Sequence, residues 1–386
     1  MRALDMRMPK RRRRLAGVGV LGALVIGLGW FLAPSASGAA GLPTESDAGP
    51  SGEATLVAVS CASARWCVAV GYSGLDTLIE SWNGSGWTVS PSPDRGATSS
   101  LGGVACVSTR WCLAVGSYKD RAGVSRALVE IWNGSSWSIG ASPGLRAGAV
   151  SLSGVSCVSA RLCAAVGGAG TGSLMEYWNG STWTAVATQT PSGRGNLNGV
   201  SCSSPGSCVA VGNDGGRTLV ASWNGTRWST VPSPTPGRWG GLAGVSCPSA
   251  RSCLAVGNYS TGTGSGSSTP PGTLVESYNG TTWSVVPDPT PPVALLFAVS
   301  CLSASFCQAV GEYPDTSGSF RALIQHWNGH AWSVEPNPSP PVAYLYGVSC
   351  VSARLCQAVG EFAPSTSGAR SYRALIESWN GRAWST

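Results

Sequence analysis

A sevenfold internal repeat constrains this chain more than any other feature of its sequence. Its cysteines form C-x5-C pairs, and successive pairs begin 45 to 54 residues apart. Each pair is followed by an aromatic-Asn-Gly step and, five residues after that aromatic, by a tryptophan. These couples are Trp82 with Trp87, Trp132 with Trp137, Trp178 with Trp183, Trp223 with Trp228, Tyr278 with Trp283, Trp327 with Trp332 and Trp379 with Trp384. The same order in every copy predicts a repeat architecture.

Each repeat has the pattern of four short strands. Residues 152–157 and 163–167 are typical of the first two strands, and residues 374–379 and 283–286 are typical of the third and fourth. Asn-Gly between the last two is a strong hairpin signal, because both residues tolerate a positive φ. Whether this loop has two residues or four, strand alternation places its two aromatics on one face, as direct or diagonal neighbours.

Repeats of 45 to 50 residues with four strands are typical of β-propeller blades. Small residues on the first two strands suit a crowded axis, and tryptophans on the outer two suit the wider rim. We therefore predict an all-β fold, a seven-bladed β-propeller with four short antiparallel strands per blade. The expected blades are residues 55–96, 97–147, 148–193, 194–238, 239–290, 291–338 and 339–386. How the ring closes stays open, because the last strand is short and the polar stretch 44–53 does not resemble a donated strand.

Cysteines in a C-x5-C pair face each other across a hairpin, within reach of a disulfide. The expected bonds are Cys61 with Cys67, Cys106 with Cys112, Cys157 with Cys163, Cys202 with Cys208, Cys247 with Cys253, Cys301 with Cys307 and Cys350 with Cys356. The alternative is metal binding, which usually needs C-x2-C pairs that converge with histidine, and the chain has only His326 and His330. We predict structural disulfides, with no metal and no cofactor.

The charge is concentrated at the N-terminus. Residues 1–33 carry seven basic side chains and one acidic one, whereas the rest of the chain has 18 basic and 17 acidic residues. Basic residues followed by the apolar run 15–33 indicate export. Residues 1–40 are thus a signal peptide or an N-terminal membrane anchor helix, followed by a polar linker, 41–54. We predict a secreted or cell-surface protein, tethered by 15–33 if that run is retained, with no other contact with a membrane.

Composition excludes several classes of protein. A chain with 43% apolar residues and 17 tryptophans is not disordered. Fourteen cysteines argue against the cytosol. The nearly neutral repeat region gives no electrostatic reason to expect nucleic acid. A total of 23 arginines against two lysines indicates a GC-rich bacterial genome.

The W-N-G-x-x-W hairpin, as in residues 178–183, resembles the Asp-box turn of sialidase-type propellers, although it is one residue shorter and has Asn where Asp is expected. The full unit, C-x5-C-x-A-V-G…W-N-G-x-x-W, resembles the repeats of exported bacterial seven-bladed propeller proteins, with a kelch-like architecture. The resemblance covers residues 55–386 and implies the fold. It transfers no catalytic residue, because the arginine triad and the tyrosine–glutamate pair of sialidases have no counterpart here.

Functional residues are expected on one face of the disc. In a four-stranded blade, the strand one–two and strand three–four turns share a face, and here these turns are uniform. The opposite face collects the variable strand two–three turns and inter-blade connections, and variable loops on a rigid scaffold usually carry function. The candidate binding residues are Tyr72, Tyr118, Asn213, Tyr259, Glu312, Tyr313, Glu361 and Phe362, with Trp239, Tyr344 and Tyr346 in nearby connections.

Two sets of glutamates recur. Glu312 and Glu361 directly follow A-V-G in adjacent blades. They are candidate acid/base residues for glycoside hydrolysis if they lie about 5–10 Å apart; the alternative is a pair of solvated rim residues. A second set recurs on the third strand and is interpreted as a satisfied framework: Glu80, Glu130, Glu176, Glu276 and Glu377.

The sequence therefore favours a non-catalytic, monomeric binding or scaffold module. Its partner would be a glycan or an extracellular protein, bound through the variable face. The alternatives are a propeller enzyme of the glycoside hydrolase or lyase type and a purely structural envelope protein.

Overall fold

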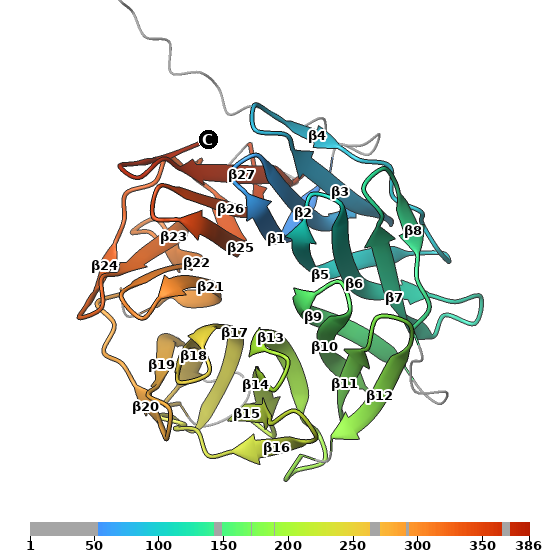
Figure 1. The fold of residues 1–386 in the computed structure, drawn as a ribbon. Coiled ribbons are helices and arrows are strands. Elements are labelled where there is room, and N and C mark those ends of the chain that lie inside the picture. The colour runs from blue at the N-terminus through green and yellow to red at the C-terminus, as the bar shows by residue number, and fades with distance from the viewer. Residues whose placement is uncertain are drawn as a thin grey trace, which may run out of the picture. The chain divides into compact units, whose positions relative to one another are not determined.

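The computed structural model describes residues 53–142, 149–170, 172–188, 190–262, 271–290, 293–364 and 371–386. The expected export segment and most of the linker lie outside these residues. The described residues belong to one compact unit, Leu42–Thr386. Seven sheets surround a central axis (Figure 1), and each contains four antiparallel strands in sequence order. The prediction of a seven-bladed, all-β propeller is confirmed.

The strands of the first four blades are β1 (Thr55–Ser63), β2 (Trp66–Ser73), β3 (Asp76–Trp82), β4 (Trp87–Val89), β5 (Ser99–Ser108), β6 (Trp111–Lys119), β7 (Ser125–Trp132), β8 (Trp137–Ile139), β9 (Val150–Ser159), β10 (Leu162–Ala169), β11 (Gly172–Trp178), β12 (Trp183–Thr188), β13 (Asn196–Ser204), β14 (Ser207–Asp214), β15 (Arg217–Trp223) and β16 (Trp228–Val231). Those of the last three are β17 (Trp239–Ser249), β18 (Ser252–Ser260), β19 (Gly272–Tyr278), β20 (Trp283–Val285), β21 (Leu295–Ser303), β22 (Phe306–Pro314), β23 (Phe320–Trp327), β24 (Trp332–Val334), β25 (Ala343–Ser352), β26 (Leu355–Phe362), β27 (Arg373–Trp379) and β28 (Trp384–Ser385).

The first strand of each blade lies against the axis, where neighbouring backbones approach closely. A Cβ atom added to Gly154 would lie 2.9 Å from the carbonyl oxygen of Asn198 in the next blade. The A-V-G glycine has a similar role within a blade, because a Cβ on Gly167 would lie 2.0 Å from the carbonyl oxygen of Ser151. These two glycines therefore permit the close approach of backbones near the axis.

The Asn-Gly hairpin has four loop residues. Trp82 pairs directly with Trp87, and the Asn83 N–H donates to the Gly86 carbonyl at 3.3 Å. The Trp82 indole N–H donates to the carbonyl of Ala64 in the C-x5-C turn at 3.2 Å, which couples the two hairpins of the blade. In most blades the fourth-strand tryptophan is buried, as is Trp332 at 4% exposure. These aromatic pairs therefore form part of the core.

All seven expected disulfides are present, and the paired Cα atoms lie 3.9 to 4.1 Å apart. The bonded pairs are Cys61 and Cys67, Cys106 and Cys112, Cys157 and Cys163, Cys202 and Cys208, Cys247 and Cys253, Cys301 and Cys307, and Cys350 and Cys356. Each bond joins the first two strands of one blade, so none connects two blades. The described residues contain no free cysteine.

The second cysteine of every pair belongs to the hydrophobic core. These seven residues are at most 2% exposed: Cys67, Cys112, Cys163, Cys208, Cys253, Cys307 and Cys356. The C-x5-C spacing predicted their bonds but not their burial, because the neighbouring blade covers them. Cys112, for example, packs in one cluster with Val68 and Ile79 of the preceding blade. The second cysteine of each pair is therefore a structural residue of the blade interior.

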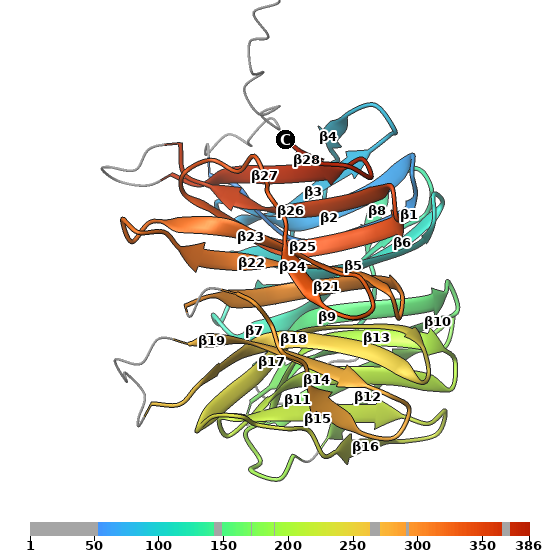
Figure 2. The same cartoon turned by 90° about the vertical axis from the view of Figure 1, so that its left-hand side faces the viewer.

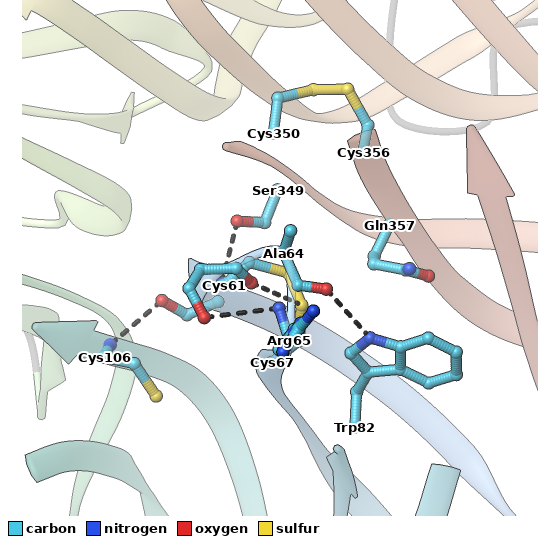
Figure 3. Close-up of a disulfide and its surroundings, with 12 residues drawn as sticks. Cys61, Ala64, Arg65, Cys67, Trp82, Cys106, Ser349, Cys350, Cys356 and Gln357 are labelled. Atoms are coloured by element: carbon cyan, nitrogen blue, oxygen red, sulfur yellow. Dashed lines mark hydrogen bonds between the residues drawn. A yellow bond between two sulfur atoms is a disulfide. The ribbon is translucent and has the colours of Figure 1, made fainter. Parts of the chain in front are cut away.

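Neighbouring blades are joined by a repeated hydrogen bond. The serine before the first cysteine of one blade accepts from the backbone N–H of the first cysteine of the next blade, as Ser60 does from Cys106 at 2.9 Å. The same bond closes the ring, because Cys61 N–H donates to Ser349 Oγ at 3.0 Å (Figure 3). All four strands of blade seven come from the C-terminal repeat. The ring therefore closes by blade-to-blade packing, without a donated strand.

Blade two lacks this serine and has Ala105 in its place. We expect Ala105→Ser to stabilise the protein by about 1 kcal/mol, because the new hydroxyl can accept from the Cys157 N–H in blade three. Chemical denaturation would measure the change. The matched control, Ser201→Ala, removes the existing bond from Cys247 and should lower stability by a similar amount. A destabilising Ala105→Ser would contradict this role for the serine.

Candidate functional site

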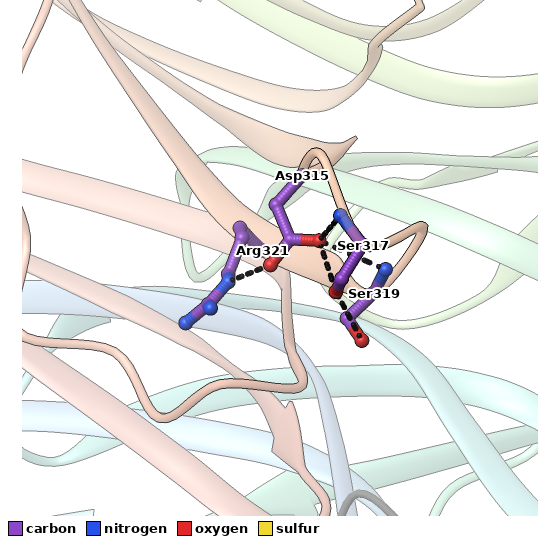
Figure 4. A network of polar contacts seen from close by, with 4 residues as sticks. All are labelled: Asp315, Ser317, Ser319 and Arg321. Atoms are coloured by element: carbon purple, nitrogen blue, oxygen red, sulfur yellow. Dashed lines mark hydrogen bonds and ion pairs between the residues drawn. The ribbon is translucent and has the colours of Figure 1, made fainter.

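The variable face is the end of the disc that carries the strand two–three turns and the inter-blade connections. Figure 2 shows the disc from its edge, with these turns at one side. Two of the turns are held by an aspartate that bridges the loop. Asp315 accepts from Ser317, Ser319 and, at 2.8 Å, from Arg321 (Figure 4). These bonds, led by the Ser317 hydroxyl, lower the pKa of Asp315, so the aspartate stays ionised and the turn stays fixed.

Glu312 lies at this face on β22, opposite Leu295. Its side chain is only 8% exposed, and it has no hydrogen-bond partner in the part of the chain that the structure describes. Burial, and then the charge of Glu361, raises its pKa to about 7. The interpretation of Glu312 as a solvated rim residue is therefore wrong, because the position in the repeat does not show how deeply a side chain is buried in the folded ring.

Glu361 lies on β26 in the next blade and is half-buried. It accepts a hydrogen bond from the Tyr346 hydroxyl at 3.0 Å and a short one from the Thr55 hydroxyl. Burial and the nearby Glu361 charge raise the pKa of Tyr346, which therefore remains a hydrogen-bond donor. Because Thr55 belongs to β1, this group spans the junction where blade seven meets blade one.

Several aromatic rings pack together beside Glu361, which lies opposite Tyr344 in the sheet and accepts a hydrogen bond from Tyr346. Tyr344 and Tyr346 stack with their centroids 6.2 Å apart, and Phe297 lies 5.4 Å from Tyr346. Phe320 and Tyr372 pack against Tyr344 at 5.7 and 5.9 Å. We define the carboxyl–aromatic cluster as Glu312, Glu361, Thr55, Phe297, Tyr344 and Tyr346. Carboxylates beside aromatic faces form a suitable environment for an organic cation.

The carboxyl–aromatic cluster borders a cavity on the propeller axis. This cavity has a volume of about 210 Å³ and is lined by the first strands of all seven blades. Phe297 and Tyr346 supply its aromatic lining, whereas the equivalent positions in other blades are smaller, such as Gly102 and Ala243. The axis is therefore asymmetric, with its bulky side next to Glu312 and Glu361.

The other predicted residues do not join this cluster. Tyr72 and Tyr118 line a separate pocket of about 300 Å³ between blades one and two. The candidates Tyr259, Tyr313 and Phe362 pack against hydrophobic clusters of the last three blades. Asn213 lies in β14, opposite Asn196 and Thr218. A third pocket, of about 500 Å³, contains Arg194 and Asn196.

Sequence reasoning missed Thr55 and Phe297. The sequence did contain a signal for Phe297. It precedes the small residue of the first strand at a position whose residue type differs from blade to blade. No comparable signal existed for Thr55, since its role depends on ring closure.

The described ranges contain no group of three or more His, Cys, Asp and Glu residues placed to hold a metal ion. Within the same ranges, no helix is long and apolar enough to cross a membrane.

No protein-family model matches the chain, and no curated protein sequence matches it. Solved structures are similar in fold. YCF48 bound to D1 peptide has 11% identity and a TM-score of 0.53, covering 83% of this chain and 95% of its own. YCF48 from Cyanidioschyzon merolae has 14% identity and a TM-score of 0.54, covering 88% and 98%. A GH74 xyloglucanase from Xanthomonas campestris has 13% identity and a TM-score of 0.45, covering 85% and 60%. At these identities the likeness shows a propeller fold, and the seven disulfides indicate an oxidising, extracytoplasmic environment.

Proposed function

We propose that this chain is a non-catalytic, cell-surface or secreted binding module for an extracellular protein. It receives a lysine or arginine side chain of its partner at the carboxyl–aromatic cluster. The observation that carries the proposal is Glu312, a residue that is 8% exposed, whose carboxyl group lies in the field of the Glu361 charge and has no hydrogen bond to another described residue. Burying such a group is unfavourable unless a ligand satisfies it.

The neighbouring groups favour a cation as that ligand. Glu361 adds a second carboxyl, already oriented by Tyr346 and Thr55. The tyrosine pair, Tyr344 and Tyr346, offers aromatic surface for the aliphatic stem and charge of a basic side chain. A fold neighbour has a peptide as its ligand, which supports a protein partner over a glycan.

Binding should depend on pH. A cationic ligand needs the ionised form of Glu312, whose pKa is raised to about 7. We therefore expect the affinity for peptides with one lysine or arginine to rise about tenfold between pH 6 and pH 8. Isothermal titration with a peptide library would measure this, with acetyl-lysine and citrulline versions of the same peptides as controls.

The variant Glu312→Gln/Glu361→Gln should weaken binding of basic peptides 10- to 100-fold and remove the pH dependence. Tyr72→Phe, in the separate pocket, should leave both unchanged. Equal affinity for the charged and neutralised peptides would overturn the proposal. So would binding to a glycan array alone, or a glycoside hydrolase activity that the double substitution abolishes.

A further inference from the structure

The constant face is the end of the disc opposite the carboxyl–aromatic cluster, formed by the C-x5-C turns and the Asn-Gly turns. Every blade places at least one exposed basic side chain in these turns. Five blades have an arginine in the C-x5-C turn. Blades four and six have Gly206 and Ser305 there and carry a basic residue in the Asn-Gly turn instead. The basic ring consists of Arg65, Arg110, Arg161, Arg227, Arg251, His330, Arg354 and Arg382.

No acidic residue balances the basic ring. The C-x5-C and Asn-Gly turns contain no Asp or Glu. Within the described ranges, none of the eight side chains takes part in an ion pair, and the two ion pairs found there, Arg126–Asp120 and Arg321–Asp315, lie on the variable face. The chain after residue 33 is nearly neutral overall. The acidic residues that offset this positive charge in the total therefore lie outside the constant face. Several of them, including Asp76 and Asp214, lie at the variable face.

The arginines of the C-x5-C turns are held in a common way. The backbone N–H of Arg110 donates to Ser108 Oγ at 3.2 Å, and that of Arg161 donates to Ser159 Oγ at 3.2 Å. The arginine stem then lies over the glycine of the Asn-Gly turn: a Cβ on Gly180 would lie 2.9 Å from the Arg161 Cγ atom. The fold thus directs these guanidinium groups to the same end of the disc and leaves them without intramolecular partners among the described residues.

We propose that the constant face docks onto a lipid bilayer that carries anionic headgroups, which replaces the expectation from sequence that only the N-terminal segment contacts a membrane. Six blades carry an arginine in these turns and blade six carries His330, so the basic ring extends around the whole disc. A planar surface can engage all of this ring, whereas a linear polymer would contact only one sector. Arginine binds phosphate groups particularly well, through parallel N–H bonds. The aromatic residues of these turns do not insert, because Trp66 and Trp111 pack against the core clusters of the blades.

The apolar run near the N-terminus and the length of the segment that follows it support a bilayer as the partner. The apolar run 15–33 is expected to enter a membrane at least during export, and residues 34–54 can span roughly 70 Å when extended. This length lets either face reach the membrane. Docking by the constant face leaves the variable face turned away from the lipid, but the inference does not depend on the function proposed for that face.

The test compares the full chain on vesicles of phosphatidylcholine and on vesicles that also contain phosphatidylglycerol. The ratio of the two partition coefficients is the readout, because an apolar anchor would contribute to both. Anionic vesicles should also slow hydrogen exchange in the C-x5-C and Asn-Gly turns but not in the strand two–three turns. Arg65→Gln/Arg110→Gln/Arg161→Gln should lower the ratio about 100-fold, since each arginine near an anionic surface contributes about fivefold.

The matched control carries the same change in net charge on the variable face: Arg121→Gln/Arg217→Gln/Arg238→Gln. It should alter the ratio less than twofold, and thermal melting should show that both triple variants are folded. An equal fall in both triples would mean that net charge alone acts, and would overturn the proposal. Equal partitioning onto the two vesicles, or tighter binding to soluble polyglutamate or duplex DNA than to the anionic vesicles, would overturn it too.

Discussion

Reduction of the disulfides is expected to unfold the propeller at ordinary temperature. Each bond closes a seven-residue loop, which is worth about 2.3 kcal/mol in the chain-entropy model. Together the seven bonds amount to roughly 16 kcal/mol as an upper bound, comparable to the whole free energy of unfolding of a typical domain, about 5–15 kcal/mol. Their effect is distributed over all blades, because each bond fixes the inner hairpin of its own blade.

The measurement is circular dichroism melting of the oxidised protein and of protein reduced in denaturant, alkylated and returned to buffer. Mass spectrometry would count the modified thiols. The matched control is Cys202→Ala/Cys208→Ala, which removes one bond and should cost about 2 kcal/mol while leaving the ring folded. If the fully alkylated chain melted within a few degrees of the oxidised protein, the disulfides would have no structural role.

The second large effect is a loss of stability as the pH rises from about 4.5 to 7. Glu130, Glu276 and Glu377 on the third strands are almost fully buried. Each accepts a hydrogen bond from a serine in the preceding inter-blade connection, as Glu276 does from Ser233 at 2.7 Å, and each keeps a second oxygen without a partner. Burial raises the pKa of all three to about 7, against the opposing effect of the serine.

The sign follows from proton binding. Between pH 4.5 and 7 the folded state holds these protons more tightly than the unfolded chain, so the free energy of unfolding falls as the pH rises and levels off above pH 7. Each group contributes about 3 kcal/mol to this fall. Urea denaturation at several pH values would measure it.

The variant Glu130→Gln/Glu276→Gln/Glu377→Gln should remove most of the slope and be several kcal/mol more stable than the wild type at pH 8. Blade six supplies a natural precedent, because Gln325 occupies this position and donates to Asp288 at 2.7 Å. Asp76→Asn, at an exposed turn, should leave the slope unchanged. A wild-type stability that increases between pH 5 and pH 7.5 would contradict this account.

Much of the fold follows from local pattern. The repeated C-x5-C spacing predicts the disulfides, and the Asn-Gly step predicts the outer hairpin, because both depend on contacts between residues close in sequence. The third-strand glutamates are buried framework residues, as their recurrence indicated, but the expectation that they are satisfied is wrong for Glu130, Glu276 and Glu377, which each keep one oxygen without a partner.

Residues whose role depends on another blade were harder to interpret. In every blade except blade two, a serine precedes the first cysteine and belongs to a visible motif. Its partner lies one blade away, as for Ser60 and Cys106, 46 residues apart, or, at the ring closure, 288 residues away. The variable-face candidates share a position in the repeat, yet Tyr72 lines a pocket between blades one and two, whereas Glu312 is buried beside Glu361 at blades six and seven. The position of a residue in the repeat determines on which face of the disc it lies. Which candidates come together in one site depends on the side chains that neighbouring blades contribute.

By itself, the sequence determined the number of blades, their strands, the disulfides and the separation of a constant face from a variable one. These features depend on periodicity and short-range geometry, which any copy of the repeat displays. Only the tertiary structure decided how the ring closes and that Glu312 is buried beside Glu361, Tyr346 and Thr55. The physical reason is that burial and pKa depend on which side chains approach from the next blade, and this approach is defined only when the first and last repeats meet.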